Sequence, residues 1–365
     1  MNLRKDYLQK LAELAGRNGM DAVLICPSEE MLFFTGFNPM MCERFQGLFV
    51  KNDGSLFYIC NLLYAGQIRE AFGDEIPVYT WFDGDVMTDI VGGILREQGL
   101  GGRTIGVNSS AQAFNILEIM DKTDVTFRNA KPLLEEVRIH KSHEELEKLR
   151  KAASIDDEVY VEVLKYIKAG MTEQDVCDFL TREMAARGGT DMWNIVASGP
   201  NSSYPHYNDS RRVLQDGDAV VLDFGCKWQG MFSDMSRTVF IGRISDENRR
   251  IYELVDRANH AAEDAVKEGA FIPDIDQAAR DVLATQGLAE TLINRVGHGI
   301  GYMVHEAPDI KKSNPRRLEK GMAFSIEPGA YLEGRVGMRV EDIVVINEKG
   351  EREVLNKSSR AIYEL

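Results

Sequence analysis

In the first third of the chain, apolar residues form short continuous runs, and between these runs they recur at helical spacing. The runs "DAVLIC" (21–26), "GRTIGV" (102–107) and "DVTFRNA" (124–130) are typical of strands. The run "GLFVKNDGSLFYIC" (47–60) is typical of two strands joined by an Asn-Asp-Gly turn. A helical pattern over "AQAFNILEIMDK" (111–122) completes a mixture that predicts an α/β domain.

The rest of the chain follows the order helix, helix, strands twice. The first copy contains a long helical pattern from about residue 143 and a second helix after Thr172, which has capping-box spacing to Asp175. The second copy contains "SDENRRIYELVDRANHAAEDAVKEG" (245–269), a shorter helical pattern and strands from Gly321 onward. We therefore expect an α/β N-terminal domain over residues 1–135. A C-terminal domain of two similar helix-helix-sheet halves with facing sheets should follow over residues 136–365.

Composition narrows the range of partners and compartments. The 365 residues carry a formal charge of -15, which repels phosphate backbones and anionic lipids, so we expect neither nucleic acid nor membrane as a partner. The N-terminal segment has the pattern of an amphipathic helix rather than of a signal peptide. The five cysteines are odd in number and scattered, which predicts reduced thiols and a cytoplasmic protein.

Acidic residues interrupt apolar strand patterns at matched places in the two halves. Asp223 and Asp234 do so in "AVVLDFGCKWQGMFSDMSRT", and Glu327 and Glu341 do so in "GMAFSIEPGAYLEGRVGMRVEDIVVI", with Glu341 expected inside a strand. Between the two pairs, "GHGIGYMVHEAP" places His298 between glycines. A buried carboxylate costs several kcal/mol unless its charge is compensated. The pattern therefore predicts that cations lie beside these carboxylates.

Four carboxylates and one imidazole form an oxygen-rich set that suits Mn²⁺, with Co²⁺, Fe²⁺ or Zn²⁺ as other candidates. Each residue also has an ordinary interpretation, such as a turn residue for Asp223 or Glu327 and an edge-strand charge for Glu341. The conjunction of the five residues favours a metal site. The spacing by itself does not identify a reaction.

These segments resemble the creatinase, aminopeptidase P and prolidase family, whose catalytic domain has the pita-bread fold. The motifs "LDFG", "SDMSRT", "GHGIGYMVHEAP", "SIEPGAY" and "GMRVEDIVV" occur in the family's order, and "MLFFTGF" resembles part of its N-terminal domain. The resemblance covers nearly the whole chain. It implies a creatinase-like N-terminal domain followed by a pita-bread domain.

The resemblance also implies a site with two divalent metal ions, most readily Mn²⁺. Its ligands are expected to be Asp223, Asp234, His298, Glu327 and Glu341. Asp234 and Glu341 would bridge the two ions, and Glu327 would also move the proton of the attacking water. His206, in "SGPNSSYPHY", and His305 are expected to donate hydrogen bonds to the substrate or the tetrahedral intermediate. Arg339 is expected to act in the site, and Tyr331 to support the ligands.

The implied reaction is hydrolysis of the bond before proline in dipeptides or short peptides. An enzyme restricted to dipeptides should bind the free carboxylate with a cation, whereas "HEAPDIKK" has Asp309 where several prolidases have arginine. The family further implies a homodimer. A creatinase-like hydrolase of a non-peptide amide or amidine is the alternative, and a non-catalytic peptide-binding module is a more distant one.

Overall fold

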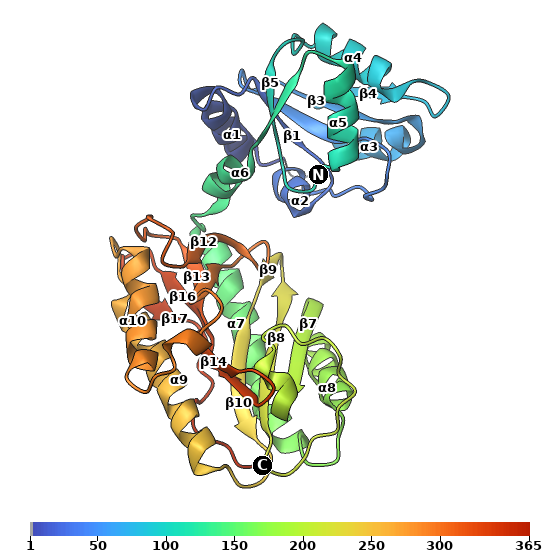
Figure 1. Ribbon diagram of the computed structural model, residues 1–365. Helices are drawn as coiled ribbons and strands as arrows, with labels where there is room; N and C mark the ends of the chain where they lie inside the picture. Colours follow the sequence, from blue (N-terminus) through green and yellow to red (C-terminus); the bar gives the residue numbers. More distant parts are fainter. Residues whose placement is uncertain (1–2) are drawn as a thin grey trace. The chain divides into compact units, whose positions relative to one another are not determined.

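The computed structural model describes residues 3–365, which form two compact units divided after Arg138 (Figure 1). The second unit comprises Ile139–Leu365. Each unit has its own buried hydrophobic core, which is the condition for an independent domain.

A six-stranded sheet forms the centre of the first unit, with the order β4-β3-β2-β1-β5-β6. The expected strands are β1 (Ala22–Ile25), β2 (Gly47–Lys51), β3 (Leu56–Asn61), β5 (Thr104–Val107) and β6 (Thr126–Asn129), and β4 (Val78–Trp81) completes the sheet. β2 and β3 pair antiparallel across the Asn-Asp-Gly turn, where Gly54 has a φ of 86°. The helices are α1 (Lys5–Arg17), α2 (Glu29–Thr35), α3 (Ala65–Phe72), α4 (Met87–Glu97), α5 (Ala113–Lys122) and α6 (Lys131–Arg138).

The first half of the second unit contains two helices and an antiparallel sheet. The helices α7 (His143–Tyr166) and α8 (Glu173–Ala186) both begin with a capping box, the second one at the expected Thr172 and Asp175. The sheet has the order β10-β8-β7, from β7 (Thr190–Ser198), β8 (Ala219–Trp228) and β10 (Met235–Phe240), and the short β9 (Met231–Phe232) pairs with β8. Side chains from α7, α8 and β8 share one core.

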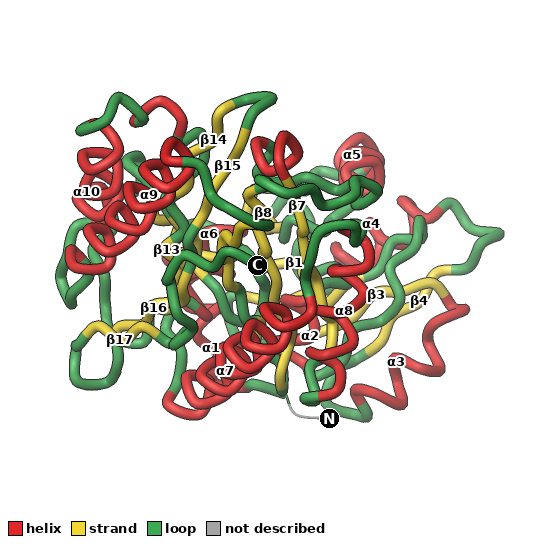
Figure 2. Tube along the Cα trace, turned by 90° about the horizontal axis from the view of Figure 1, so that it is seen from below, coloured by secondary structure: helices red, strands yellow, loops and turns green. Residues whose placement is uncertain are grey.

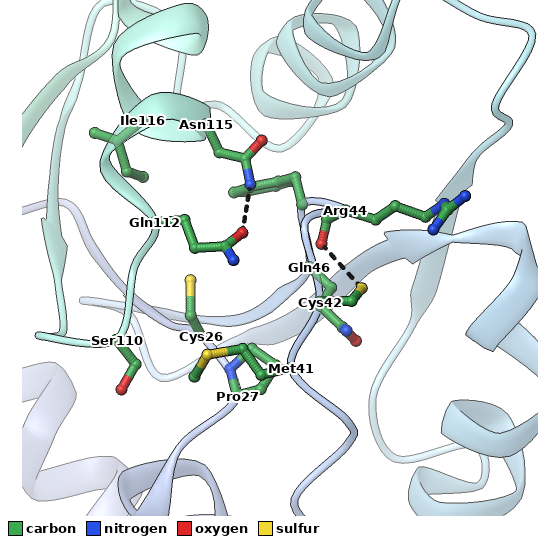
Figure 3. A pocket seen from close by; sticks show the side chains of 11 residues that line it. Cys26, Pro27, Met41, Cys42, Arg44, Gln46, Ser110, Gln112, Asn115 and Ile116 are labelled. Atoms are coloured by element: carbon green, nitrogen blue, oxygen red, sulfur yellow. Dashed lines mark hydrogen bonds between the residues drawn. The ribbon is translucent and has the colours of Figure 1, made fainter.

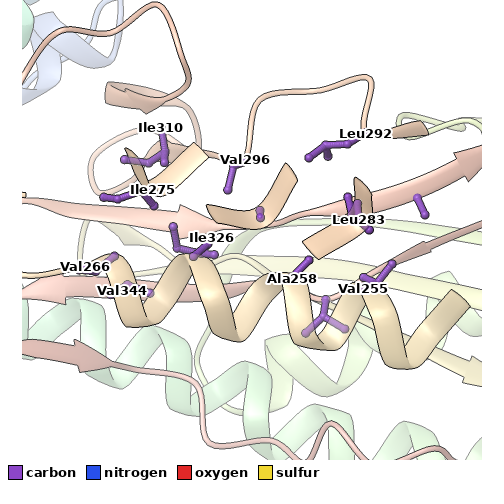
Figure 4. Packing of buried hydrophobic residues seen from close by; sticks show 14 of the residues in the cluster. Val255, Ala258, Val266, Ile275, Leu283, Leu292, Val296, Ile310, Ile326 and Val344 are labelled. Atoms are coloured by element: carbon purple, nitrogen blue, oxygen red, sulfur yellow. The ribbon is translucent and has the colours of Figure 1, made fainter. Parts of the chain in front are cut away.

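The second half repeats this arrangement. The helices α9 (Asp246–Ala265) and α10 (Ile272–Ala284) run side by side (Figure 2). Their apolar faces belong to the same core as side chains of a five-stranded sheet, and Figure 4 shows Val255 and Ala258 of α9 with Ile326 and Val344 among the buried residues of this core. The sheet has the order β12-β11-β13-β16-β17, from β11 (Gly297–Gly299), β12 (Glu306–Ile310), β13 (Ala323–Ile326), β16 (Asp342–Ile346) and β17 (Arg352–Val354). A hairpin of β14 (Gly329–Leu332) and β15 (Val336–Arg339) leaves this sheet.

The two halves meet between β10 and the segment that joins β15 to β16. Ser236 and Glu341 form a single antiparallel bridge, in which the Glu341 N–H donates to the Ser236 carbonyl at 3.0 Å. Beside it, the Thr238 hydroxyl donates to the Arg339 carbonyl at 3.0 Å. The expected mixed α/β class and the two-halved C-terminal domain are confirmed. Across residues 3–365, every helix is too short or too polar to cross a bilayer.

Candidate metal centre

The five predicted ligands lie at strands or directly beside them. Asp223 lies within β8, His298 within β11, and Glu327 directly after β13. Asp234 lies between β9 and β10, and Glu341 lies between β15 and β16. The expectation that Glu341 is inside a strand is therefore wrong in detail. The chain leaves the β14–β15 hairpin here and joins another sheet, so the regular ladder is interrupted at Glu341.

These side chains converge although they come from five separate places in the chain. Ligand atoms of three sets, Asp223–Asp234–Glu341, His298–Glu327–Glu341 and Asp234–His298–His305, each lie within 4.8 Å of one another. The His298 Nε2 atom lies 3.4 Å from Asp234 Oδ2, 3.5 Å from Glu327 Oε1 and 3.8 Å from Glu341 Oε1. The sets share members, so all five predicted ligands belong to one cluster, which His305 joins as a sixth residue.

Two oxygens of the cluster indicate that a cation fits it. Asp234 Oδ1 and Glu341 Oε1 are buried and have no hydrogen-bond partner among the described residues. An unpartnered buried carboxylate oxygen is energetically expensive, and coordination of a cation removes the penalty. Four carboxylates and an imidazole are also the donor set that divalent ions of intermediate hardness prefer. The residues present therefore fit a divalent metal site.

The electrostatics of the cluster give the same indication. Burial, followed by repulsion from Asp223 and Glu327, raises the pKa of Asp234 well above its usual value. Burial and the neighbouring Glu341 raise the pKa of Glu327 to about 7. Burial, followed by the charges of Asp234 and Asp223, raises the pKa of Glu341 to about 8. The carboxylates therefore repel one another in the absence of added positive charge.

One protein cation, Arg339, partly offsets this repulsion. Its buried guanidinium pairs with Asp223 through Nη2, and donates to Ser236 Oγ at 2.7 Å and to the Tyr331 hydroxyl at 3.0 Å. Burial lowers the pKa of Arg339, but the neighbouring acids, led by Asp223, outweigh this and raise the pKa well above its usual value. Arg339 therefore stays charged. One guanidinium balances only one of the four carboxylates.

His206 and His305 lie at the open side of the cluster. The His305 ring centroid is 4.2 Å from that of His298 and 6.4 Å from that of His206. Both His206 and His305 are exposed, as residues that contact a substrate should be. Desolvation of the ring and the charge of His298 lower the pKa of His305. A neutral imidazole carries an N–H that can donate to a bound oxygen.

Comparison with models of protein families shows which family the chain belongs to. Residues 147–348 match the model of metallopeptidase family M24, and residues 8–140 match the creatinase/prolidase N-terminal domain. The chain belongs to metallopeptidase family M24. This confirms the family that the motifs indicated, and makes the chain a metallopeptidase of the prolidase type.

Relatives of this M24 peptidase match it over nearly its whole length. A probable dipeptidase PepE from Mycobacterium tuberculosis is 35% identical over 96% of this chain and 94% of its own. An Xaa-Pro dipeptidase from Pyrococcus horikoshii is 28% identical over 99% of this chain and 100% of its own. Among solved structures, a prolidase from Thermococcus sibiricus is 31% identical, with a TM-score of 0.92 and complete coverage of both chains.

The structure of the M24 peptidase also shows supporting residues that the sequence pattern did not indicate. Asn259 of α9 donates to the carbonyls of Ile326 and Val340, at 2.8 and 3.0 Å, which directly precede Glu327 and Glu341. The sequence contained one signal for this role: Asn259 lies within the buried stripe of a helix, where an apolar residue is usual.

Two further polar side chains contact the predicted ligands directly. The Ser236 hydroxyl lies 2.7 Å from oxygens of both Asp223 and Glu341. Asn294 Nδ2 donates to Glu327 Oε2 at 3.4 Å. Ser236 lies in the quoted "SDMSRT" motif, but its contact with Glu341 depends on how the two halves pair, which the sequence does not show.

Proposed function

We propose that this M24 peptidase hydrolyses the bond before proline at the N-terminus of dipeptides or short peptides, using two divalent metal ions, foremost Mn²⁺. The observation that carries the proposal is the convergence of the five predicted ligands, four of them buried, with unpartnered oxygens on Asp234 and Glu341. The relatives named Xaa-Pro dipeptidase support the substrate class.

Asp223, Asp234, His298, Glu327 and Glu341 would hold the metals, and Asp234 and Glu341 each belong to two of the three sets of neighbouring ligand atoms. When bound, two divalent ions lower the pKa of a water molecule and polarise the scissile carbonyl. The protein keeps the surrounding carboxylates in place through Arg339, Ser236 and Asn259. Their hydrogen bonds fix the ligand directions before the substrate arrives.

Glu327 is suited to accept and return a proton. It lies at the edge of the cluster, its side chain is 12% exposed, and its raised pKa is near neutrality. Asn294 donates to one of its oxygens and leaves the other directed at the cluster. His206 and His305, on the exposed side, would donate hydrogen bonds to the substrate carbonyl and to the oxyanion that develops from it.

A hollow of about 530 Å³ adjoins Glu327 through Asn294, and we propose that it receives the carboxyl end of the peptide. Its lining is rich in cations, which are Arg280, Arg295, Lys311 and Lys312. Acids compensate three of them, because Asp276, which also lines the hollow, pairs with Arg280 at 2.7 Å, and Asp309 pairs with Arg295 at 2.7 Å and with Lys311 at 2.6 Å. The hollow should therefore accept an uncharged amide as well as a free carboxylate, so peptides longer than two residues should also be cleaved.

Stripped enzyme assayed with added Mn²⁺, Co²⁺ or Zn²⁺ tests the proposal. Xaa-Pro, Xaa-Pro-amide, Xaa-Pro-Xaa and Xaa-Ala peptides form the panel, with creatine as the non-peptide control. We expect metal-dependent cleavage only before proline, with about two equivalents of metal bound. Asp223→Asn should lose both metal and activity. Cleavage of Xaa-Ala at an equal rate, or of creatine alone, would contradict the proposal.

We further propose a homodimer that forms through the first unit. Exposed apolar side chains occur there on Met41, Leu63, Phe82, Phe114 and Leu117. The elements that carry them are tied together, since Arg44 pairs with Asp83, Asn61 donates to Asp83, and Asn115 donates to the Glu43 carbonyl. Figure 3 shows the adjoining pocket between Cys42 and Asn115.

Exposed apolar side chains on elements that contact one another are a common feature of interfaces. Light scattering coupled to gel filtration should give twice the chain mass, and Phe82→Glu with Leu117→Glu should give the chain mass itself. Cytoplasmic location is proposed because all five cysteines are free. A periplasmic or secreted protein in a fractionation experiment would contradict it.

A further inference from the structure

A fully buried ion pair lies next to the proposed active site. Lys141 Nζ contacts Glu306 Oε1, and the two side chains are 0% and 1% exposed. Lys141 is the third residue of the second unit, and Glu306 directly follows His305. A buried ion pair loses its hydration, and for this reason apolar residues of similar size often give equal or greater stability. Stability alone therefore does not explain its presence.

The pair fastens the segment that carries His305. Residues 301–305 belong to no helix or strand, so backbone ladders do not determine their conformation. Glu306 accepts a hydrogen bond from the Met303 N–H at 3.2 Å through its second oxygen. The Lys141 side chain passes so close to Gly301 that a Cβ atom there would lie 2.6 Å from Lys141 Cε. The ion pair thus contacts both ends of the 301–306 segment.

The lysine side of this contact is itself fixed. The Lys141 N–H donates to the Gly321 carbonyl at 2.8 Å, and α7 begins two residues later. A second contact joins the same two segments, because the Tyr302 hydroxyl donates to Glu145. Glu145 is held in turn by the capping box at the start of α7. The 301–306 segment is therefore attached to a rigid helix terminus by two side-chain contacts.

His305 has no such attachment of its own. Its side chain is exposed, contacts the ring of His298, and makes no hydrogen bond to the described part of the chain. We propose that Lys141 and Glu306 are positioning residues, which hold the 301–306 segment so that the His305 imidazole faces the bound substrate. This inference rests on the proposed function, in which His305 donates to the substrate or to the developing oxyanion.

The test replaces the pair by uncharged residues of similar size, Lys141→Met with Glu306→Gln, in the full-length, metal-loaded enzyme. The double variant has no unpaired buried charge, so it should fold and bind wild-type amounts of metal. We expect kcat for an Xaa-Pro peptide to fall at least tenfold while KM changes less than twofold. Loss of a contact made in the transition state lowers kcat, whereas a merely less stable protein keeps it.

A double-mutant cycle identifies the residue through which the pair acts. In a His305→Ala background, the same double substitution should change kcat less than twofold, because the positioned group is already absent. The matched control is the buried pair Arg138–Glu30 of the first unit, whose side chains are 4% and 6% exposed. Arg138→Met with Glu30→Gln should leave kcat unchanged.

A wild-type kcat in the uncharged double variant Lys141→Met with Glu306→Gln, here called the neutral pair, would overturn the inference. So would a full additional loss of kcat when the neutral pair is combined with His305→Ala. If the neutral pair does not fold, Tyr302→Phe and Lys141→Arg replace it. Tyr302→Phe should lower kcat without changing KM, and Lys141→Arg should retain most of the wild-type kcat. An unchanged kcat in Tyr302→Phe with a large loss in Lys141→Arg would overturn the inference. If the wild type cleaves no Xaa-Pro peptide, the proposed function fails separately. The positioning is then measured by the His305 imidazole signals of ¹⁵N-histidine-labelled protein, which should shift in the neutral pair.

Discussion

Removal of metal followed by a rise in pH should destabilise the catalytic unit through Glu327 and Glu341. Both carboxyl groups are buried among other acids, and their pKa values in the folded protein are about 7 and about 8 against an ordinary 4.5. Since the folded state binds these protons more tightly than the unfolded chain, it is favoured at low pH. The stabilisation that these two protons provide is complete below about pH 4.5 and is lost as pH rises through 7 to 8.

The size of the effect follows from the shifts. One pKa unit corresponds to about 1.4 kcal/mol, so Glu327 alone accounts for about 3 kcal/mol and Glu341 alone for about 5 kcal/mol. The two values share the repulsion between the groups and are not additive, and the 12% exposure of the Glu327 side chain reduces its part. A total on the order of 5 kcal/mol should lower Tm by roughly 10 °C in a domain of this size.

Thermal unfolding of EDTA-treated protein between pH 5 and pH 8.5 measures this effect. The control is Glu341→Gln, which keeps the shape of the side chain but cannot ionise, so the pH dependence of the variant reports all other groups. We expect the wild type to lose more stability than the variant over this range. Added Mn²⁺ should raise Tm far more at pH 8 than at pH 5.5, because coordination requires ionised carboxylates.

Parallel Tm curves for wild type and Glu341→Gln without metal would refute the reasoning. Such a result would mean that the carboxylates are solvated or apart in solution. An equal Mn²⁺ effect at both pH values would refute the link between protonation and coordination.

Three further predictions concern single substitutions. Asp234 belongs to two of the three sets of neighbouring ligand atoms, and Asp234→Asn removes its negative charge. Bound metal, measured by atomic absorption, should therefore fall from about two equivalents to one or fewer. Arg339→Met should cost about 3–5 kcal/mol in urea unfolding, because Asp223 would lose its buried partner, whereas Tyr331→Phe should cost only about 1 kcal/mol. Gly299→Ala places a Cβ atom 2.2 Å from the Ala307 carbonyl group, so it should separate β11 from β12 and weaken metal binding at the adjacent His298; unchanged metal affinity would contradict this geometry.

Local patterns were sufficient to predict most of the elements. The Asn-Asp-Gly turn marks the β2–β3 hairpin, and Thr172 with Asp175 marks the start of α8, because turns and caps depend on residues close in sequence. Carboxylates in apolar strand patterns also indicated a charge-compensated site, since the energetic cost of burying them is a property of the residue and its immediate neighbours.

Long-range contacts could not be obtained in the same way. The sequence does not show that Asn259 supports the carbonyls before both Glu327 and Glu341, nor that Lys141 reaches Glu306 across 165 positions. These contacts depend on the packing of α9 on its sheet and on the place where α7 begins beside the 301–306 segment. Glu341 likewise falls outside the expected strand because the chain changes sheets there.

The amino-acid order by itself thus determined the α/β class, the two-halved second unit and the kinds of atoms offered to a metal. Only the tertiary structure decided that those atoms meet within 4.8 Å, which oxygens lack a partner, and which side chains hold them there. The physical reason is that secondary structure and burial cost depend on neighbouring residues, whereas the distance between remote side chains depends on how the sheets pair and the helices pack.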